Sequence, residues 1–275
     1  MFQRRLQELD HQSLTRRLHT LGSATGPTIE LAGRTVILLA SNDYLGLATH
    51  PDVVQAAIQA TTQYGAGAGA ARLVCGTLPP HTDLEQALAI FKQTPSALIY
   101  GSGYLANLGV IPSLITRGGL IFADRLCHAS LIDGARLSGA DLRVYRHRDL
   151  NHLESLLKRT TPGRPLLIVT DGLFSMDGDL APLPELATLA ERFSATLYVD
   201  DAHGTGVMGQ SGRGTLEHFG VEDRIPFHMG TLGKALGSSG AYIAGPTDMI
   251  QYLVNTSRPF MFTTAPPPAS AAAAY

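Results

Sequence analysis

Five short apolar runs in this chain are each followed directly by residues whose side chains or backbone could do chemistry. The segments are GSGYLAN after residues 97–100, DRLCHAS after 120–123, DGLFSMDGD after 166–170, DDAHGTG after 196–199 and GTLGKALG after 227–229. Ligand sites in open α/β sheets lie beyond the carboxyl ends of the strands. If the runs are strands of one sheet, the five segments meet at one edge and form a single site.

Lys234 stands in the last of these segments among residues with almost no bulk. It lies between Gly233 and Ala235, with Thr231 before it and GSSG at 237–240 after it. A lysine in such a loop is most often a solvated surface group. A lysine partly removed from water, however, loses preference for its charged form and becomes an amine nucleophile. With a strand-end aspartate, a nearby histidine and a phosphate cradle, Lys234 fits the Schiff-base lysine of a pyridoxal phosphate site.

Gly101 and Gly103 lie between an apolar run and a predicted helix that begins near Tyr104. A helix N-terminus offers free backbone N–H groups and the positive end of the helix dipole, so a phosphate would fit there. A plain tight turn is the alternative. The same glycines, followed by Ala106, also match a dinucleotide fingerprint, with Asp124 near the spacing of a ribose contact. A nicotinamide-dependent oxidoreductase is therefore a second hypothesis.

Asp200, Asp201 and His203 gather after another apolar run. Such a group could bind a metal or could be a hydrogen-bonded pair in a polar loop. A metal site needs a third ligand of fixed type. The sequence does not single one out, and we predict no metal.

At these residues the chain resembles the α-oxoamine synthases, a family of fold type I enzymes in the class II pyridoxal-phosphate-dependent aminotransferase superfamily. The motifs that carry the resemblance are SNDYLGL at 41–47, CHASLIDGARLSGA at 127–140, FSMDGD at 174–179, VDDAHGTGVMG at 199–209 and TLGKALG at 231–237. It extends from near Arg16 to near Pro268. The family condenses an amino acid with an acyl thioester and releases carbon dioxide, with pyridoxal 5′-phosphate as cofactor.

Within the family, the motifs are most similar to those of the members that join L-alanine to a pimeloyl thioester in biotin biosynthesis. The acyl donor would be pimeloyl-CoA or a pimeloyl-carrier protein. The segment HGTG at 203–206 is less similar to 5-aminolevulinate and serine palmitoyl relatives. Glycine C-acetyltransferase, or 2-amino-3-ketobutyrate CoA ligase, is the nearest alternative. The resemblance also implies a homodimer with the active site at the subunit boundary.

The resemblance implies three catalytic residues. Lys234 would bond the cofactor and later move the α-proton of the amino acid. Asp200 would pair with the pyridinium nitrogen and keep it protonated. His128 would stack on the cofactor ring and contact the substrate.

The resemblance also implies residues that only bind. His203 and Ser175 would bond the phenolic oxygen of the cofactor ring. Thr231 and the backbone of Gly103 and Tyr104 would hold the phosphate. Arg16, in SLTR, would meet the acyl substrate, although the family often has Gly-Leu-aromatic-Arg there.

These residues need a scaffold, and the hydrophobic pattern predicts an α/β fold. Strands are expected at 97–100, 120–123, 142–145, 166–170, 196–199, 227–229 and 241–244, and helical stretches alternate with most of them. Alternating βα units predict a mostly parallel sheet flanked by helices on both faces. Before them we expect an amphipathic helix at 2–21, a hairpin at 28–39, and helices at 52–64 and 81–92.

We expect three parts along the chain. Residues 1–50 form an N-terminal helix and hairpin segment, and 51–260 form a large domain that binds pyridoxal phosphate. Residues 261–275, with the sequence MFTTAPPPASAAAAY, read as the start of a connection to a C-terminal domain that is absent.

Composition limits the class of partner. The net charge is −2 and the 21 basic residues are scattered, so no electrostatic footprint for nucleic acid or anionic membrane is present. Residues 94–116 carry no charge, but Gly101, Gly103, Asn107 and Pro112 indicate a strand, turn and helix rather than a membrane span. Cys75 and Cys127 have no metal-ligand or disulfide spacing, and no targeting segment is evident. We expect a cytoplasmic enzyme with small-molecule substrates.

Overall fold

The computed structural model describes all 275 residues and divides into two compact units, Met1–Ser41 and Asn42–Tyr275. The first unit holds α1 (Phe2–His11) and an antiparallel hairpin of β1 (Thr28–Leu31) and β2 (Arg34–Ile37). Ala32 and Gly33 form its turn with φ of 51° and 73°. Tight hairpin turns of this kind need positive φ at both central residues, which glycine adopts at no steric cost. The predicted hairpin is confirmed.

The long N-terminal helix predicted at 2–21 is wrong, because the structure ends α1 at His11. Ser13 then takes a left-handed conformation with φ of 55°, and the backbone N–H of Leu14 donates to the carbonyl of Leu9. No residue of α1 is buried. An isolated helix is marginal without tertiary packing, so an amphipathic pattern alone does not extend it.

The second unit is built on a sheet of seven strands in the order β3-β9-β8-β7-β6-β4-β5. The strands are β3 (Ser96–Tyr100), β4 (Leu120–Asp124), β5 (Asp141–Tyr145), β6 (Leu166–Asp171), β7 (Thr196–Asp200), β8 (His228–Thr231) and β9 (Ala241–Gly245). Strands β4 to β8 pair in parallel, and β9 is antiparallel to both of its neighbours. The predicted strands and the mostly parallel sheet are confirmed. Nine residues join β8 to β9, too few for a parallel crossover.

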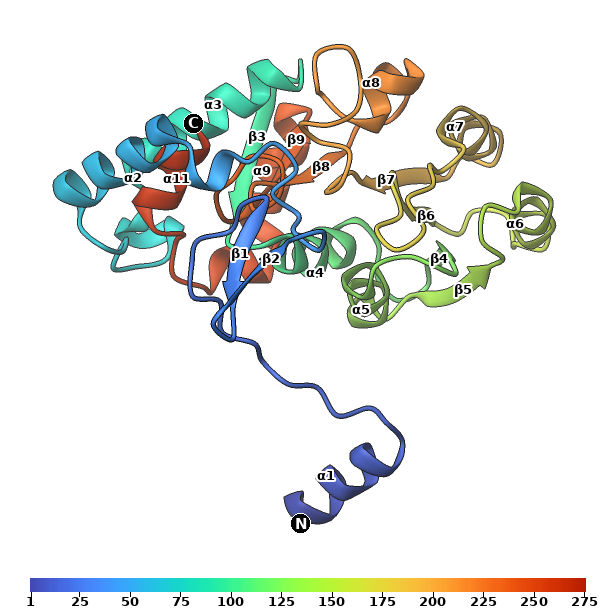
Figure 1. Cartoon of the computed structure of the whole chain (residues 1–275). Helices are drawn as coiled ribbons and strands as arrows, with labels where there is room; N and C mark the ends of the chain where they lie inside the picture. The colour runs from blue at the N-terminus through green and yellow to red at the C-terminus, as the bar shows by residue number, and fades with distance from the viewer. The chain divides into compact units, whose positions relative to one another are not determined.

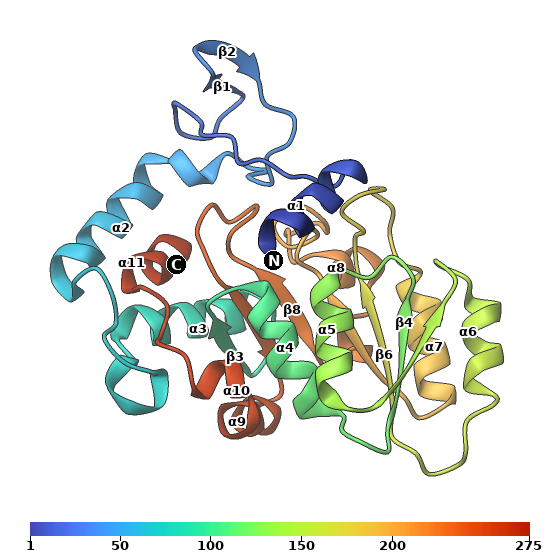
Figure 2. The same ribbon diagram turned by 90° about the horizontal axis from the view of Figure 1, so that it is seen from below.

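Both faces of the sheet are covered, as predicted. Within β4, Ile121 and Ala123 enter one core cluster, while Leu120 and Phe122 enter the other. This alternation follows from the two-residue period of a strand. The first face carries α4 (Gly103–Leu114), α5 (Ala129–Ser138), α9 (Thr247–Thr256) and α10 (Arg258–Met261) (Figure 2). The second carries α6 (Leu150–Leu157), α7 (Leu183–Arg192) and α8 (Thr215–Phe219).

Three helices pack together at the β3 end of the sheet: α2 (Pro51–Tyr64), α3 (Pro79–Phe91) and α11 (Pro268–Ala274). In Figure 1 they lie at the opposite end of this unit from α6 and α7. Ala271 of α11 is buried in a cluster with Leu84 and Leu88 of α3. Residues 268–274 are therefore packed into this unit. Short turns of helix lie at Leu47–Thr49, Arg72–Gly76 and Glu222–Arg224.

The uncharged stretch at 94–116 folds as β3, a turn and α4, with Pro112 inside the helix. None of the helices combines the length and the apolar character that a membrane crossing needs.

Candidate active site

The segments that follow the strands converge on one pocket at the carboxyl edge of the sheet. Its lining consists of residues that end or follow β4, β6, β7 and β8, and of residues at the start of α4: Gly103, Tyr104, His128, Ser130, Asp171, Asp200, Ala202, His203, Thr231 and Lys234. Seven of the nine predicted site residues are in this set. The parallel register brings them together, because the carboxyl ends of the strands lie at one edge.

The structure does not bring the other two predicted residues into the lining. Ser175 is exposed in the turn between β6 and α7. Arg16 is exposed and belongs to the first unit.

Asp200 ends β7 and is held in a fixed orientation. Its Oδ2 accepts from the side-chain amide of Asn107 at 2.7 Å, and its Oδ1 accepts from the backbone N–H of Ala202 at 3.1 Å. Tyr198 donates to the Asn107 Oδ1 at 2.8 Å, which fixes which way the amide points. The pocket therefore contains a buried, oriented carboxylate.

Sequence reasoning missed Asn107 as part of the site. It is fully buried on the second turn of α4, and its amide also donates to Ser130 at 2.8 Å. The available signal was a polar amide in a helix whose neighbours are apolar, since buried polar groups need partners. That signal predicts a partner without naming it.

Asp171 was also missed, although the segment that it begins was singled out. It ends β6, is paired in register with Asp200 on β7, and accepts from the backbone N–H of His128 at 2.9 Å. Burial, followed by the negative charge of Asp200, raises the pKa of Asp171 to about 8. Two adjacent buried carboxyl groups cannot both ionise at low cost, so Asp171 holds its proton at neutral pH.

Lys234 lies among these carboxyl groups with few partners of its own. Its Nζ donates only a long hydrogen bond to Thr231 Oγ1, at 3.4 Å. Burial lowers the pKa of Lys234, although the negative charge of Asp200 opposes the shift. A partly dehydrated, weakly bonded amine is the state that a nucleophilic lysine requires.

His203 faces the pocket from the loop after β7. Burial, and then the positive charge of Lys234, lower the pKa of His203 to about 4, so its imidazole is neutral near pH 7. The hydroxyl of Tyr44 lies 2.6 Å from its Nδ1. Tyr44 is a contact that sequence reasoning missed, even though it belongs to the SNDYLGL motif. His128 caps α5, and its ring lies edge-on to Tyr104.

The start of α4 suits an anion. Ser102 caps the helix and accepts from Leu105 N, which leaves the N–H groups of Gly103 and Tyr104 without intrahelical partners. A Cβ at Gly103 would lie 2.7 Å from Thr231 Cγ2, so this approach requires glycine. A second hollow, also lined by Gly103, Thr231 and Lys234, extends along the backbone of residues 238–240. A phosphate bound here would therefore face the positive end of the helix dipole, the free backbone N–H groups and the Lys234 side chain.

The topology contradicts the dinucleotide hypothesis. Four strands separate β3, which precedes Gly101, from β4, which ends in Asp124. Both Asp124 carboxylate oxygens accept hydrogen bonds within the chain, from the backbone N–H groups of Leu126 and Arg148. No group of three or more histidine, cysteine, aspartate or glutamate side chains could share a metal ion.

Comparison with known proteins identifies the family. The model for class I and II aminotransferases matches residues 34–275. An 8-amino-7-oxononanoate synthase from Geobacter sulfurreducens is 52% identical over 98% of this chain and 69% of its own length. One from Anaeromyxobacter sp. strain K is 54% identical over 98% of this chain and 67% of its own. The chain belongs to the 8-amino-7-oxononanoate synthase family. It spans about two thirds of the length of these relatives.

Solved structures agree on the fold and the cofactor. A serine palmitoyltransferase from S. paucimobilis with a bound PLP–myriocin aldimine superposes with a TM-score of 0.93, at 32% identity over 99% of this chain and 69% of that one. The 8-amino-7-oxononanoate synthase from Francisella tularensis gives 0.72, at 33% identity over 86% and 66% of the two chains. The family consists of acyltransferases of biotin biosynthesis whose cofactor is pyridoxal 5′-phosphate.

Proposed function

We propose that this chain catalyses the decarboxylative condensation of L-alanine with a pimeloyl thioester, giving 8-amino-7-oxononanoate, carbon dioxide and the free thiol. The observation that carries the proposal is the shared pocket of Lys234 and Asp200 beside the α4 N-terminus. Pyridoxal 5′-phosphate has a ring nitrogen, an aldehyde and a phosphate. The pocket has an oriented carboxylate, an amine with few partners and a set of free backbone N–H groups, so the residues fit the cofactor.

When bound, pyridoxal phosphate supplies an electron sink for the carbanion at the α-carbon of the amino acid. We assign Asp200 the hydrogen bond to the ring nitrogen of the cofactor. The carboxylate would keep that nitrogen protonated, through a charged hydrogen bond of about 1.5–3 kcal/mol. The hydrogen bonds from Asn107 and Ala202 would hold the carboxylate still, so little reorganisation is needed during the reaction.

We assign Lys234 two tasks. Its Nζ would bind the cofactor covalently, and the same amine, once released, would remove and return the proton at the α-carbon of alanine. Its lowered pKa supports both tasks, since each needs a neutral amine.

The remaining assignments concern binding. His128 would stack on the ring and contact the substrate, and His203 would bond the phenolic oxygen together with Ser175. Thr231 and the N–H groups of Gly103 and Tyr104 would hold the phosphate. Arg16 would bind the acyl substrate.

The alternative activity is that of a glycine C-acetyltransferase, in which glycine and a short acyl group replace alanine and pimeloyl. A direct test measures thiol release with each of the four amino acid and thioester combinations. We expect the highest kcat/KM with alanine and pimeloyl thioester, and higher activity with glycine and acetyl-CoA would favour the alternative. Pimeloyl-CoA and pimeloyl-carrier protein are compared in the same assay to identify the carrier.

The site assignment has its own test. The chain is incubated with pyridoxal phosphate, reduced with borohydride, digested and mapped by mass spectrometry. We expect the cofactor mass on the peptide that contains Lys234, and none after Lys234→Met. A label on Lys92 or Lys158 would show that the assignment is wrong.

We also propose a homodimer in the cytoplasm. An apolar groove beside α2 and α11 is lined in part by Val54 and Ile58, and both are exposed in this chain. A second copy of the chain would cover them. Both cysteines are free thiols, which supports a reducing compartment. Sedimentation of the purified chain measures its oligomeric state, and a monomer at micromolar concentration would contradict the dimer.

A further inference from the structure

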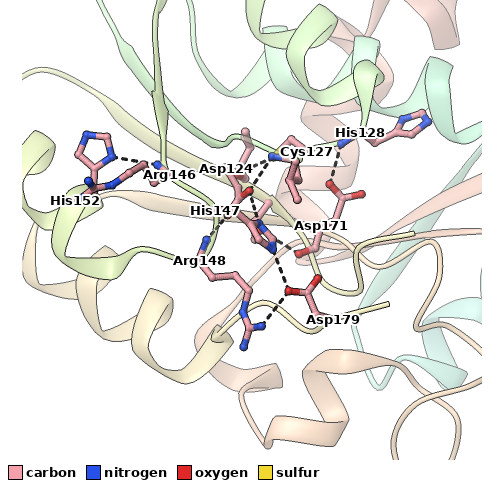
Figure 3. A network of polar contacts seen from close by, with 12 residues as sticks. Asp124, Cys127, His128, Arg146, His147, Arg148, His152, Asp171 and Asp179 are labelled. Carbon is pink, nitrogen blue, oxygen red and sulfur yellow. Dashed lines mark hydrogen bonds and ion pairs between the residues drawn. The ribbon is translucent and has the colours of Figure 1, made fainter. Parts of the chain in front are cut away.

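A polar network lies beside the pocket, outside the residues assigned above, and joins three segments that are distant in sequence (Figure 3). His147 lies between two carboxylates: its Nδ1 is 2.8 Å from Asp124 Oδ1, and its Nε2 is 2.9 Å from Asp179 Oδ2. Arg148 donates to the same Asp179 oxygen at 2.9 Å. Asp124 ends β4, the histidine follows β5, and Asp179 lies in the loop after β6.

The geometry favours a protonated imidazole. Both ring nitrogens face carboxylate oxygens, and only the imidazolium donates from both. Burial opposes the charge on His147, but the hydrogen bonds to Asp124 and Asp179 raise its pKa. For Asp179, the hydrogen bonds from His147 and Arg148 lower the pKa against the effect of burial. The charged groups that face His147 are therefore Asp124 and Asp179, and the Arg148 guanidinium shares the same Asp179 oxygen with the imidazole.

The network also fixes the backbone around it. Asp124 Oδ1 accepts from Leu126 N at 2.8 Å in the loop that leads to His128. Its Oδ2 accepts from Arg148 N at 2.9 Å, and Arg148 adopts a φ of 55° that is uncommon for a non-glycine residue. Asp124 is 1% exposed, so this anchor is rigid.

Asp179 fixes the end of the loop at residues 172–180. Its carbonyl accepts from Phe174 N at 2.9 Å, and the Phe174 ring stands edge-on to His147, with centroids 4.6 Å apart. The loop leaves the pocket at Asp171 and carries Ser175 between these two contacts. Its conformation therefore depends on the bridge at His147, because the bridge binds both the carboxylate and the aromatic ring.

We propose that His147 is a positioning residue, whose protonated imidazole joins Asp124 to Asp179 and holds the loop at residues 172–180, with Ser175 on it, in one fixed conformation next to the pocket. The loop's dependence on His147 stands on the contacts above. The consequence for the cofactor rests on the proposed function, since it uses the role assigned to Ser175.

The first experiment needs no cofactor. Hydrogen–deuterium exchange is measured on residues 172–180 in the wild type, in His147→Gln and in Asp179→Asn. We expect exchange of Phe174 and Gly178 N–H to rise about tenfold or more in both variants, because local opening becomes easier. The matched control is His152→Gln, whose ring accepts from Arg146 N in the same segment but does not contact the loop. Wild-type protection in His147→Gln would overturn the proposal.

The pH dependence of the same exchange separates a charged bridge from a packing contact. Protection of the loop in the wild type should fall as pH rises through the raised pKa of His147, since the imidazolium is then lost. It should not change in this way in His147→Gln. An equal pH dependence in the two proteins would overturn the proposal.

The second experiment is a double-mutant cycle on the affinity for pyridoxal phosphate. Ser175→Ala should weaken binding about tenfold in the wild type but less than about twofold in the His147→Gln background, because there the serine is no longer positioned. Additive effects would overturn the link to the cofactor. If the wild type binds no pyridoxal phosphate, the proposed function fails, while the exchange experiment still decides whether His147 holds the loop.

Discussion

Strand β7 runs into two successive aspartates that serve two different regions, and each region contains a lysine. Asp200 faces the pocket, which Lys234 lines. Asp201 lies on the other side, where burial raises the pKa of its carboxyl group and the positive charge of Lys92 opposes that shift. Because side chains alternate along an extended chain, neighbouring residues of one type enter separate environments.

The Asp201 region is closed, and its polar groups are paired. The Asp201 carboxylate accepts from the hydroxyl of Thr215 at 2.7 Å and from its backbone N–H at 2.9 Å. Lys92, 1% exposed, donates to the carbonyl of Arg213. Gly214 has a φ of 112°, and a Cβ there would lie 1.8 Å from an Asp201 oxygen, so only glycine fits. This region fixes the loop at 201–215, which carries His203 on its pocket side.

The pocket contrasts with this closed region, because its charged groups are buried but incompletely paired. Lys234 has one long hydrogen bond, and Asp171 is held protonated beside Asp200. Unpaired buried groups cost stability, and they persist where a ligand completes the set. One pair of residue types can therefore hold a loop on one side of a strand and bind a ligand on the other.

The largest effect should come from Lys92→Met. We expect it to reduce the free energy of unfolding by about 3 kcal/mol at pH 8, because Asp201 loses its compensating charge and the Arg213 carbonyl loses its donor. Burial raises the pKa of Asp201 to about 6 even with Lys92 present. Without Lys92 this carboxyl group can bind a proton, so the loss should be smaller at pH 5. Urea denaturation at the two pH values measures both.

The control for this prediction is Lys234→Met in the cofactor-free protein. It should change the free energy of unfolding by less than about 1 kcal/mol, since it removes a dehydrated cation with weak partners. If the two substitutions destabilise the chain equally, the contrast between the regions is wrong.

A second prediction concerns pH and Asp171. Its pKa is about 8 in the folded chain and near its usual value of 3.8 when unfolded, so between these values only the folded state holds the proton. The free energy of unfolding contributed by this group therefore falls as pH rises from about 4 to 8. Asp171→Asn removes this pH dependence. The free energy of unfolding of the variant, relative to that of the wild type, should therefore rise by at least about 1.4 kcal/mol across that window.

Denaturant titrations at several pH values test the sign. Asp201→Asn is the matching variant in the closed region. There the fall in unfolding free energy with rising pH should stop near pH 6, because the pKa of Asp201 is about 6. A constant difference between Asp171→Asn and the wild type would contradict a protonated Asp171.

Much of the pocket could be predicted from the sequence, because its residues follow apolar runs directly. Lys234, Asp200 and His203 stand at strand ends, and any parallel sheet brings such ends to one edge. What could not be predicted is which strands are neighbours. Asp171 meets Asp200 only because β6 pairs with β7, and the sheet order comes from tertiary packing rather than from local pattern.

Partners from distant elements were also beyond the sequence. Asn107 on α4 contacts Asp200 across 93 residues, and Lys92 reaches Arg213 across 121. Neither the helix pattern nor the residue types specify these contacts. The N-terminal helix was predicted too long for a related reason: its apolar face has the right period, but no packing partner stabilises residues beyond His11.

The smallest effects come from deleting one hydroxyl group in each region. Tyr242→Phe removes the 3.0 Å hydrogen bond between that hydroxyl and Thr205 Oγ1 in the closed region. Thr205 is buried, so its hydroxyl is left without a partner, and we expect a loss of about 1–2 kcal/mol in unfolding free energy. Tyr44→Phe removes the 2.6 Å contact with His203 Nδ1, but Tyr44 is 42% exposed, and water can replace it.

The Tyr44 substitution should therefore cost at most about 0.5 kcal/mol in unfolding free energy. Its effect should appear instead in the affinity for pyridoxal phosphate, because His203 is a proposed ligand whose orientation depends on this hydroxyl. Thermal denaturation and cofactor titration on both variants separate the two regions with the same atom deleted. We expect Tyr242→Phe to change mainly stability and Tyr44→Phe mainly affinity. The reverse result would mean that the closed region, and not the pocket, adjusts when the cofactor binds.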